Sequence, residues 1–160
     1  MQKAIFAAGC FWGVQYYFDQ VPGVKKTITG YIDGKTKNPT YEQVCTHKTG
    51  HAEATLIEFD PVKVNYETLV KQFFRIHDPT QLNRQDPDVG DQYRSAIYYF
   101  DNEQKNTAEK VKQELQSSFA RPIVTEVTKA SEFYPAEDYH QKYTQRTGRG
   151  FCHVDYAPVS

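Results

Sequence analysis

Residues 3–20 read KAIFAAGCFWGVQYYFDQ, a short apolar run followed by a helical pattern that begins at a cysteine. The run at 3–8 has the length and composition of a buried strand, and Gly9 ends it. From Cys10 onward apolar residues recur near helical spacing, until a Pro-Gly pair at 22–23 stops the pattern. The stretch predicts a strand, a tight turn and a helix, with Cys10 at the helix start.

The rest of the chain alternates strand-like and helix-like segments. Strands are predicted at 24–33, 51–59, 95–100 and 123–128, helices at 66–77, from Asp101 toward Phe119 and at 136–145, and a helical turn at 41–44. A long polar loop at 78–93 is of the kind that tends to be functional. We predict an α+β fold, a single-domain two-layer α/β sandwich with a mixed sheet. The domain spans 1–160, and its irregular C-terminal tail, 146–160, is expected to be mobile.

Composition and charge exclude several classes of protein. The 160 residues carry 19 Lys and Arg against 20 Asp and Glu, for a net charge of −1 and no basic stripe, which argues against nucleic-acid binding. No apolar stretch approaches the roughly 18–20 residues of a membrane span. Three widely spaced cysteines suit a reducing cytoplasm better than a disulfide framework. Without a C-x-x-C pair or a glycine-rich phosphate loop, neither a metal nor a bound cofactor is expected.

Cys10 is the first candidate for chemistry. A thiol at a helix N-terminus faces unpaired N–H groups and the positive end of the helix dipole. Both favour the thiolate, so we expect a pKa below the free value near 8.5 and a reactive sulfur. Cysteine is also one of the residues most often buried for packing alone, so local physics leaves both interpretations open.

Glu53 is the second candidate, in the strand HAEATLIEF at 51–59. Alternation places it on the same face as Thr55, Ile57 and Phe59. An acid on a buried apolar face would keep its proton near neutral pH and could act as a general acid. The alternative is that Ala52, Ala54 and Leu56 mark the core face and that Glu53 points to solvent.

Several motifs, in one order, resemble the methionine sulfoxide reductase A family. They are GCFWG at 9–13, TGY at 29–31, NPTY at 38–41, VC at 44–45, TGHAEA at 49–54, HDP at 77–79, NRQ at 83–85, DVG at 88–90 and YRS at 93–95. The likeness runs from about residue 5 to about residue 143. One departure is Asp86-Pro87, where relatives more often have Gly-Asn.

The resemblance implies a ferredoxin-like plait core and a role for each site residue. Cys10 would be the nucleophile and Glu53 the acid. Tyr41 and Tyr93 would hold the sulfoxide oxygen, and Asp88 would orient substrate or water. The cage for the S-methyl group would be formed by Phe11 and Trp12.

The resemblance also implies how the thiol is regenerated. Cys152, in Gly-Phe-Cys at 150–152, matches a recycling cysteine that would attack the sulfenic acid left on Cys10. Thioredoxin would then reduce the disulfide. The substrate would be the S epimer of methionine sulfoxide, free or in proteins, and we expect a monomer. Cys45 is expected to be a structural bystander.

Two rival functions belong to other classes. A cysteine hydrolase would need Cys10 within hydrogen-bond reach of a basic histidine, for which His51 and His140 are the nominees. A non-enzymatic binding module for sulfoxides or peptides would keep the aromatic residues but would not need Cys10 and Glu53, which are both present.

Overall fold

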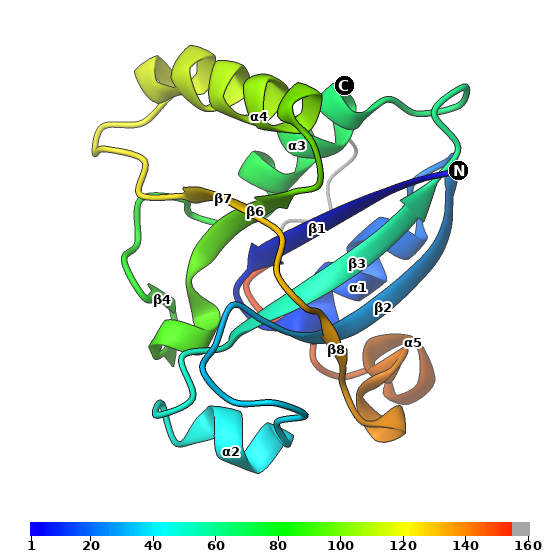
Figure 1. The fold of residues 1–160 in the computed structure, drawn as a ribbon, viewed down its shortest axis with the longest axis vertical. Helices are drawn as coiled ribbons and strands as arrows, with labels where there is room; N and C mark the ends of the chain where they lie inside the picture. The colour runs from blue at the N-terminus through cyan, green and yellow to red at the C-terminus, as the bar shows by residue number, and fades with distance from the viewer. Residues whose placement is uncertain (155–160) are drawn as a thin grey trace.

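A mixed six-stranded sheet organises the computed structural model, which describes residues 1–154 (Figure 1). Its strands, in spatial order, are β7 (Glu126–Lys129), β6 (Ser95–Tyr99), β1 (Gln2–Ala8), β3 (Ala52–Phe59), β2 (Val24–Ile32) and β8 (Tyr134–Pro135). Only β6 and β7 pair in parallel; the other neighbours in this sheet are antiparallel. The sandwich with a mixed sheet is therefore confirmed.

Three helices pack against the sheet through the main apolar cluster: α1 (Phe11–Asp19), α3 (Tyr66–Arg75) and α4 (Asn102–Leu115). Chain order β1-α1-β2-β3-α3-β6 and spatial order β6-β1-β3-β2 make the expected ferredoxin-like plait. Two short helices, α2 (Tyr41–Cys45) and α5 (Tyr143–Thr147), lie at the lower end in Figure 1. No helix among residues 1–154 is long and apolar enough to cross a membrane.

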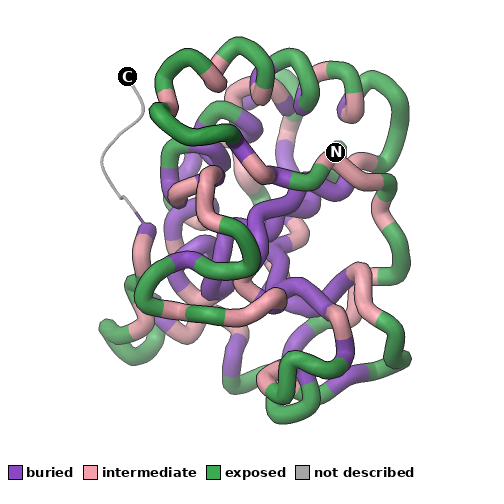
Figure 2. The backbone as a smooth tube through the Cα atoms, turned by 90° about the vertical axis from the view of Figure 1, so that its left-hand side faces the viewer, coloured by how far each residue is buried: buried purple, intermediate pink, exposed green. Residues whose placement is uncertain are grey.

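The central strands are buried on both faces, because successive residues along β1, β3 and β6 are buried. Figure 2 shows buried backbone running through the middle of the molecule. On the helix face Phe6 and Ile57 belong to the main cluster together with Phe73 of α3. On the other face Ala54 and Tyr98 belong to a smaller cluster, which Phe133 covers. Phe133 lies on the segment that crosses the front of the sheet from β7 to β8 (Figure 1). Burial on both faces is why alternation alone could not orient β3.

Several predicted boundaries were wrong for local reasons. The strand predicted at 123–128 is observed as β7 at Glu126–Lys129, because Ile123 instead packs into the core and its N–H donates to the Gln116 side chain, at 2.8 Å. That same glutamine begins a 3₁₀ turn, so α4 ends at Leu115 rather than near Phe119.

The helix predicted at 136–145 is also broken. It is a 3₁₀ turn at Asp138–His140 followed by α5, because Lys142 between them has a left-handed backbone (φ 57°). The predicted tail begins at the end of α5, and its part at 155–160 lies outside the described residues.

The long loop at 78–93 has structure of its own. It holds a two-stranded hairpin, β4 (Arg84–Gln85) and β5 (Asp88–Val89), and a 3₁₀ turn at Asp91–Tyr93. The hairpin and the turn place Asp88 and Tyr93 near the end of β1, where the predicted catalytic residues gather.

Candidate active site

Cys10 lies where β1 ends and α1 begins, as predicted. It is the N-cap residue of α1 (φ −55°, ψ 123°), and its side chain is 8 % exposed. Gly9 makes the turn with a left-handed φ of 90°. The sharp turn aims the thiol at the first helical turn, where the N–H groups have no partner within the helix.

Three of those N–H groups converge on the candidate catalytic atoms. The N–H of Phe11 donates to Oε1 of Glu53 at 3.3 Å, that of Trp12 bonds the Cys10 sulfur, and that of Gly13 bonds the Cys152 sulfur. The helix N-terminus therefore brings the carboxyl group and both thiols together, although Cys152 is 142 positions along the chain from Cys10.

The expectation that Cys10 has a lowered pKa was wrong for this structure. The Cys10 thiol is hydrogen-bonded to Cys152, and this bond, burial and the charge of Glu53 raise its pKa well above the usual value. The Trp12 N–H opposes them but does not prevail. The same hydrogen bond lowers the pKa of Cys152, helped by the Gly13 N–H. The contact between the two thiols therefore moves their pKa values in opposite directions. The Cys152 thiol also donates to the Gly150 carbonyl, at 3.1 Å.

Glu53 points inward from β3, on the face of Ile57 and Phe59. It is 1 % exposed, and burial raises the pKa of its carboxyl group well above the usual value despite the bond from Phe11. Its Oε2 is buried and has no hydrogen-bond partner among the described residues. An acid that keeps its proton and has one oxygen without a partner is equipped to donate to a ligand.

Tyr41, Tyr93 and Asp88 gather around this carboxyl group. Burial, followed by the charge of Glu53, raises the pKa of both tyrosines, so their hydroxyl groups stay protonated. Burial also raises the pKa of Asp88, whose charge acts on Glu53, Tyr93 and Cys152. All the predicted site residues therefore meet at one end of the sheet.

Aromatic rings form one wall of the site. Phe11 is buried, and the half-buried rings of Trp12 and Tyr41 stack with centroids 6.4 Å apart. Tyr143 of α5 stacks on Trp12 at 4.1 Å. The wall is apolar enough for a methyl group and adjoins the Glu53 carboxyl group, because Phe11 contributes both a ring and the N–H that holds Glu53.

Sequence analysis missed His140 and Glu137 as members of the site. The His140 ring is 1 % exposed and packs on Tyr41 at 4.3 Å, and its Nδ1 accepts from Nε1 of Trp12 at 2.9 Å. Its buried Nε2 has no partner in the described part of the chain. Glu137 accepts from the Tyr31 hydroxyl and the Tyr41 N–H, at 2.9 and 3.0 Å. Their segment was predicted only as a helix at 136–145, and only the family resemblance around 136–143 could have indicated more.

Cys45 and the two histidines nominated for a cysteine hydrolase are not paired with Cys10. Cys45 is half-buried at the rim, hydrogen-bonded to Tyr41, and burial raises its pKa. His51, a nominee of the hydrolase hypothesis, contacts the Gly34 N–H and the Thr36 carbonyl, at 3.1 and 2.7 Å. Since His140 is bonded to Trp12, neither nominee is paired with Cys10. Within residues 1–154 no three His, Cys, Asp or Glu side chains are placed to hold a metal ion.

Comparison with known proteins agrees with this geometry. The family model described as peptide methionine sulfoxide reductase matches residues 2–160. A peptide methionine sulfoxide reductase MsrA of Pasteurella multocida is 54 % identical over 158 residues, which cover 98 % of this chain and 91 % of the relative. The reduced form of Mxr1 from Saccharomyces cerevisiae superposes with a TM-score of 0.89 at 32 % identity, over 93 % of this chain and 87 % of that one.

A third comparison concerns the same yeast protein with a partner. Mxr1 in complex with Trx2 aligns at 24 % identity with a TM-score of 0.65, over 89 % of this chain and 84 % of that one, and shares its fold. The near full-length family match, joined to the placement of Cys10, Glu53 and the aromatic wall, shows that this chain belongs to the peptide methionine sulfoxide reductase family.

Proposed function

We propose that this enzyme reduces the S epimer of methionine sulfoxide, free or within proteins, to methionine, with Cys10 as the nucleophile. The observation that carries the proposal is the buried Glu53 carboxyl group, which shares the α1 N-terminus with Cys10 and has one oxygen without a partner in the described part of the chain. Sulfoxide oxygen is a strong hydrogen-bond acceptor, and it becomes a better leaving atom once it is protonated.

The first step transfers the oxygen to the enzyme. The S-methyl group lies against Phe11 and Trp12, while Tyr41, Tyr93 and protonated Glu53 donate to the sulfoxide oxygen. The Cys10 sulfur attacks the substrate sulfur as Glu53 protonates the oxygen, and the proton of the Cys10 thiol replaces the one Glu53 gave up. The hydroxyl group then passes from the substrate sulfur to the Cys10 sulfur, and both the S–O bond of the substrate and the transient bond between the two sulfurs break. Methionine leaves, and Cys10 becomes a sulfenic acid.

The second step regenerates the thiol. Cys152 attacks the sulfenic acid, so that a Cys10–Cys152 disulfide forms and the hydroxyl leaves as water with the Cys152 proton. The hydrogen bond between the two thiols supports this assignment, because little movement is needed. A dithiol donor of the thioredoxin class then reduces the disulfide by exchange. The solved complex of the yeast relative with Trx2 supports that choice of donor.

The substrate backbone is held by the polar rim. Asp88 is half-exposed beside the thiols and suits the substrate's amide or ammonium N–H. The tautomer of His140 that accepts from Trp12 carries its proton on Nε2, which suits a backbone carbonyl. We further propose that the protein acts as a monomer in the cytoplasm, since regeneration by thioredoxin requires a reducing compartment.

Reduction of both epimers with dithiothreitol tests the proposal. The wild-type enzyme should reduce the S epimer and leave the R epimer unchanged. Cys10→Ser should lose the activity completely, whereas Cys45→Ser should stay within about twofold of wild type, since a serine hydroxyl can replace the Cys45 thiol as the partner of Tyr41. Activity that survives in Cys10→Ser would overturn the assignment of the nucleophile.

Replacing the dithiol donor tests the role of Cys152. Cys152→Ser should still form about one methionine per chain in a single turnover, because the oxygen transfer needs only Cys10. Steady-state turnover with thioredoxin should collapse, because no intramolecular disulfide can form. Thioredoxin-driven rates equal to those of wild type would remove Cys152 from the scheme.

A further inference from the structure

Cys152 has a backbone conformation that it would not adopt by itself. Its φ is 62°, in the left-handed region, where the Cβ of a residue other than glycine approaches the following carbonyl oxygen. Gly148 and Gly150, at alternate positions before it, are also left-handed, but as glycines they bear no such strain. Such conformations persist only where the surrounding structure holds them, so Cys152 must be held from both sides.

The upstream side is held by α1 and α5. The hydroxyl of Thr144 donates to the Gly150 carbonyl at 2.8 Å, and Gly150 packs closely on the rings of Tyr143 and Trp12. Phe151 meets Tyr16 edge to face, with ring centroids 5.4 Å apart. These contacts fix the chain as far as the residue before Cys152.

The downstream side is held by His153. A Cβ added to Gly9 would lie 2.5 Å from Cε1 of His153 and 2.9 Å from Cβ of Gln85, so the imidazole fills the space that glycine leaves beside Cys10. The Gln85 side chain is held in place, because it is 1 % exposed and forms two hydrogen bonds with the backbone of Asp78, at 2.9 and 2.5 Å. The next residue, Val154, packs into the main core cluster.

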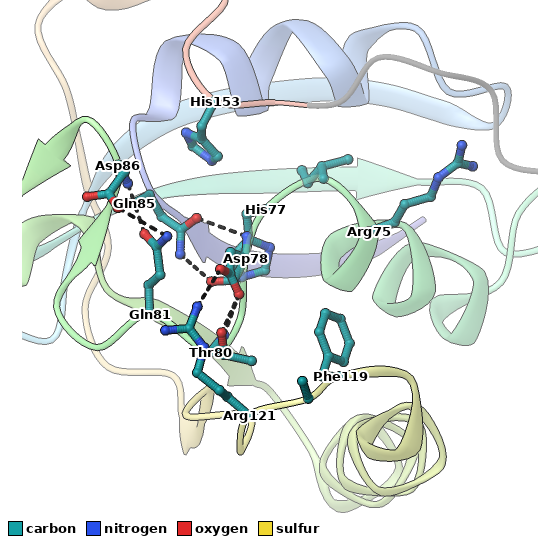
Figure 3. A pocket seen from close by; sticks show the side chains of 12 residues that line it. Arg75, His77, Asp78, Thr80, Gln81, Gln85, Asp86, Phe119, Arg121 and His153 are labelled. Atoms are coloured by element: carbon teal, nitrogen blue, oxygen red, sulfur yellow. Dashed lines mark hydrogen bonds and ion pairs between the residues drawn. The ribbon is translucent and has the colours of Figure 1, made fainter.

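The imidazole acts here by its shape. Neither ring nitrogen has a hydrogen-bond partner of good geometry among residues 1–154. Burial lowers the pKa of His153, and a poorly aligned contact with the Ala8 backbone partly opposes this shift. In Figure 3 the ring points from the C-terminal segment toward Gln85, at the edge of a pocket of about 460 Å³. Shortening residue 153 therefore leaves open space beside Gly9, and the segment loses its downstream anchor.

We propose that His153 is the positioning residue of the recycling step, and that its ring, packed on Gly9 and Gln85, holds Cys152 in the conformation that brings its sulfur to Cys10. The proposal rests on the proposed function, which supplies the sulfenic acid on Cys10. In the step it affects, the Cys152 sulfur forms a bond to the Cys10 sulfur, the S–O bond breaks, and water leaves. His153 touches neither sulfur in this scheme and acts through the backbone of its neighbour.

A single-turnover experiment separates the two steps. Reduced enzyme is mixed with excess S-epimer methionine sulfoxide without a reductant, and methionine, free thiols and sulfenic acid trapped by dimedone are measured over time. His153→Ala should form its first methionine within about twofold of the wild-type rate. Disulfide formation should slow by about 10- to 100-fold, as expected when a reacting group loses its position by roughly 1 Å. The sulfenic acid, which barely accumulates in wild type, should then be captured.

Two further variants serve as controls for the volume of the side chain at position 153 and for substitution elsewhere in the segment. His153→Leu restores a similar volume without polar atoms, so it should recover most of the rate of disulfide formation. Arg149→Ala removes an exposed side chain from the same segment and should change neither step. If His153→Ala does not fold, His153→Asn, which also withdraws the ring from Gly9, replaces it and should show the same slowing.

The outcomes are distinct. Disulfide formation at the wild-type rate in the shortened variant would overturn the proposal, and so would equal slowing in His153→Leu, because filled space is the cause invoked. If the wild-type enzyme releases no methionine from the S epimer, the proposed function itself fails. Methionine release thus tests the proposed function, and disulfide formation tests the role of His153.

Discussion

Glu53 keeps its proton because of where β3 places it, between the sheet and the first turn of α1. Because burial raises its pKa, the folded protein keeps the proton at pH values where the unfolded chain has lost it. The free energy of unfolding should therefore fall as the pH rises from about 4.3, the value for an unperturbed glutamate, toward the pKa in the folded protein.

Glu53→Gln tests this account of the acid. Without a proton to donate, kcat/KM should fall by about 10²- to 10⁴-fold, the usual worth of general acid catalysis. The variant should also be more stable than wild type near neutral pH, since it no longer buries an ionisable group. Activity assays and thermal unfolding at several pH values measure both effects.

The control lies on the same strand. Glu58→Gln replaces a partly exposed carboxylate paired with Lys3 at 3.9 Å, so it should change stability by less than about 1 kcal/mol and leave activity intact. If Glu53→Gln were less stable than wild type at neutral pH, the carboxyl group would have to be charged and paired in the folded state.

The two tyrosine hydroxyl groups should act together on the sulfoxide oxygen. Tyr41→Phe and Tyr93→Phe should each lower kcat/KM by about 10-fold or more, the usual worth of a hydrogen bond to a developing charge being about 1.5–3 kcal/mol. Tyr66→Phe removes a buried hydroxyl that has no partner among the described residues and should leave the kinetics unchanged. Wild-type kinetics in both site variants would place the oxygen elsewhere.

Single residues also show where sequence reasoning ends. Cys10 could be placed at a helix start, but its pKa depends on Cys152, whose approach no local pattern encodes. His140 stood in an apparently ordinary helix, and only the folded chain stacks it on Tyr41. Pairwise chemistry between distant positions required the structure or the family resemblance.

Among the elements, the turn from β1 into α1 does the most for the site. The unpaired N–H groups of a helix start would each need a partner, and here the partners are Glu53, Cys10 and Cys152. This element was predictable because an apolar run, a glycine and a helical pattern follow one another without ambiguity. The last residue of α4 and the first residue of β7 could not be predicted, since both depend on the Gln116 side chain, which bonds the backbone of Arg121 and Ile123.

Helix α4 gives a prediction independent of the site. Asp101 is its N-cap, and its Oδ1 accepts from the Gln104 N–H at 2.8 Å. Asp101→Ala should lower the free energy of unfolding by about 1 kcal/mol. The melting temperature should fall by roughly 2–4 °C with kcat/KM unchanged. Glu103→Ala, which removes an exposed acid from the same first turn, is the control; an equal loss there would mean that the helix charge, and not the cap, was measured.

At the scale of the whole molecule, one core ties the described segments together. The main cluster runs from Phe6 through Leu69 and Val111 to Val154, so it includes strands, helices and the residue two positions beyond Cys152. We propose that 1–160 is a single catalytic domain whose C-terminal segment carries the recycling cysteine. The two-layer sandwich could be predicted because strand-like and helix-like segments alternate along the chain, and the plait core followed from the family resemblance. The docking of the last residues could not, because it depends on side chains such as His153.

A single core predicts a single transition. Thermal or urea unfolding followed by tyrosine fluorescence and by far-ultraviolet circular dichroism should give coincident curves. Leu69→Ala should shift both curves alike and lower stability by about 2–5 kcal/mol, because Leu69 is fully buried. Curves that separate would show that the chain contains more than one cooperative unit.

The central claim is that Cys10 takes the oxygen from the substrate, and intact-mass analysis of Cys152→Ser tests it most directly. After reaction with S-epimer methionine sulfoxide in the presence of dimedone, peptide mapping should place one adduct per chain on Cys10, in proportion to the methionine released. Methionine released while Cys10 remains an unmodified thiol would contradict the account.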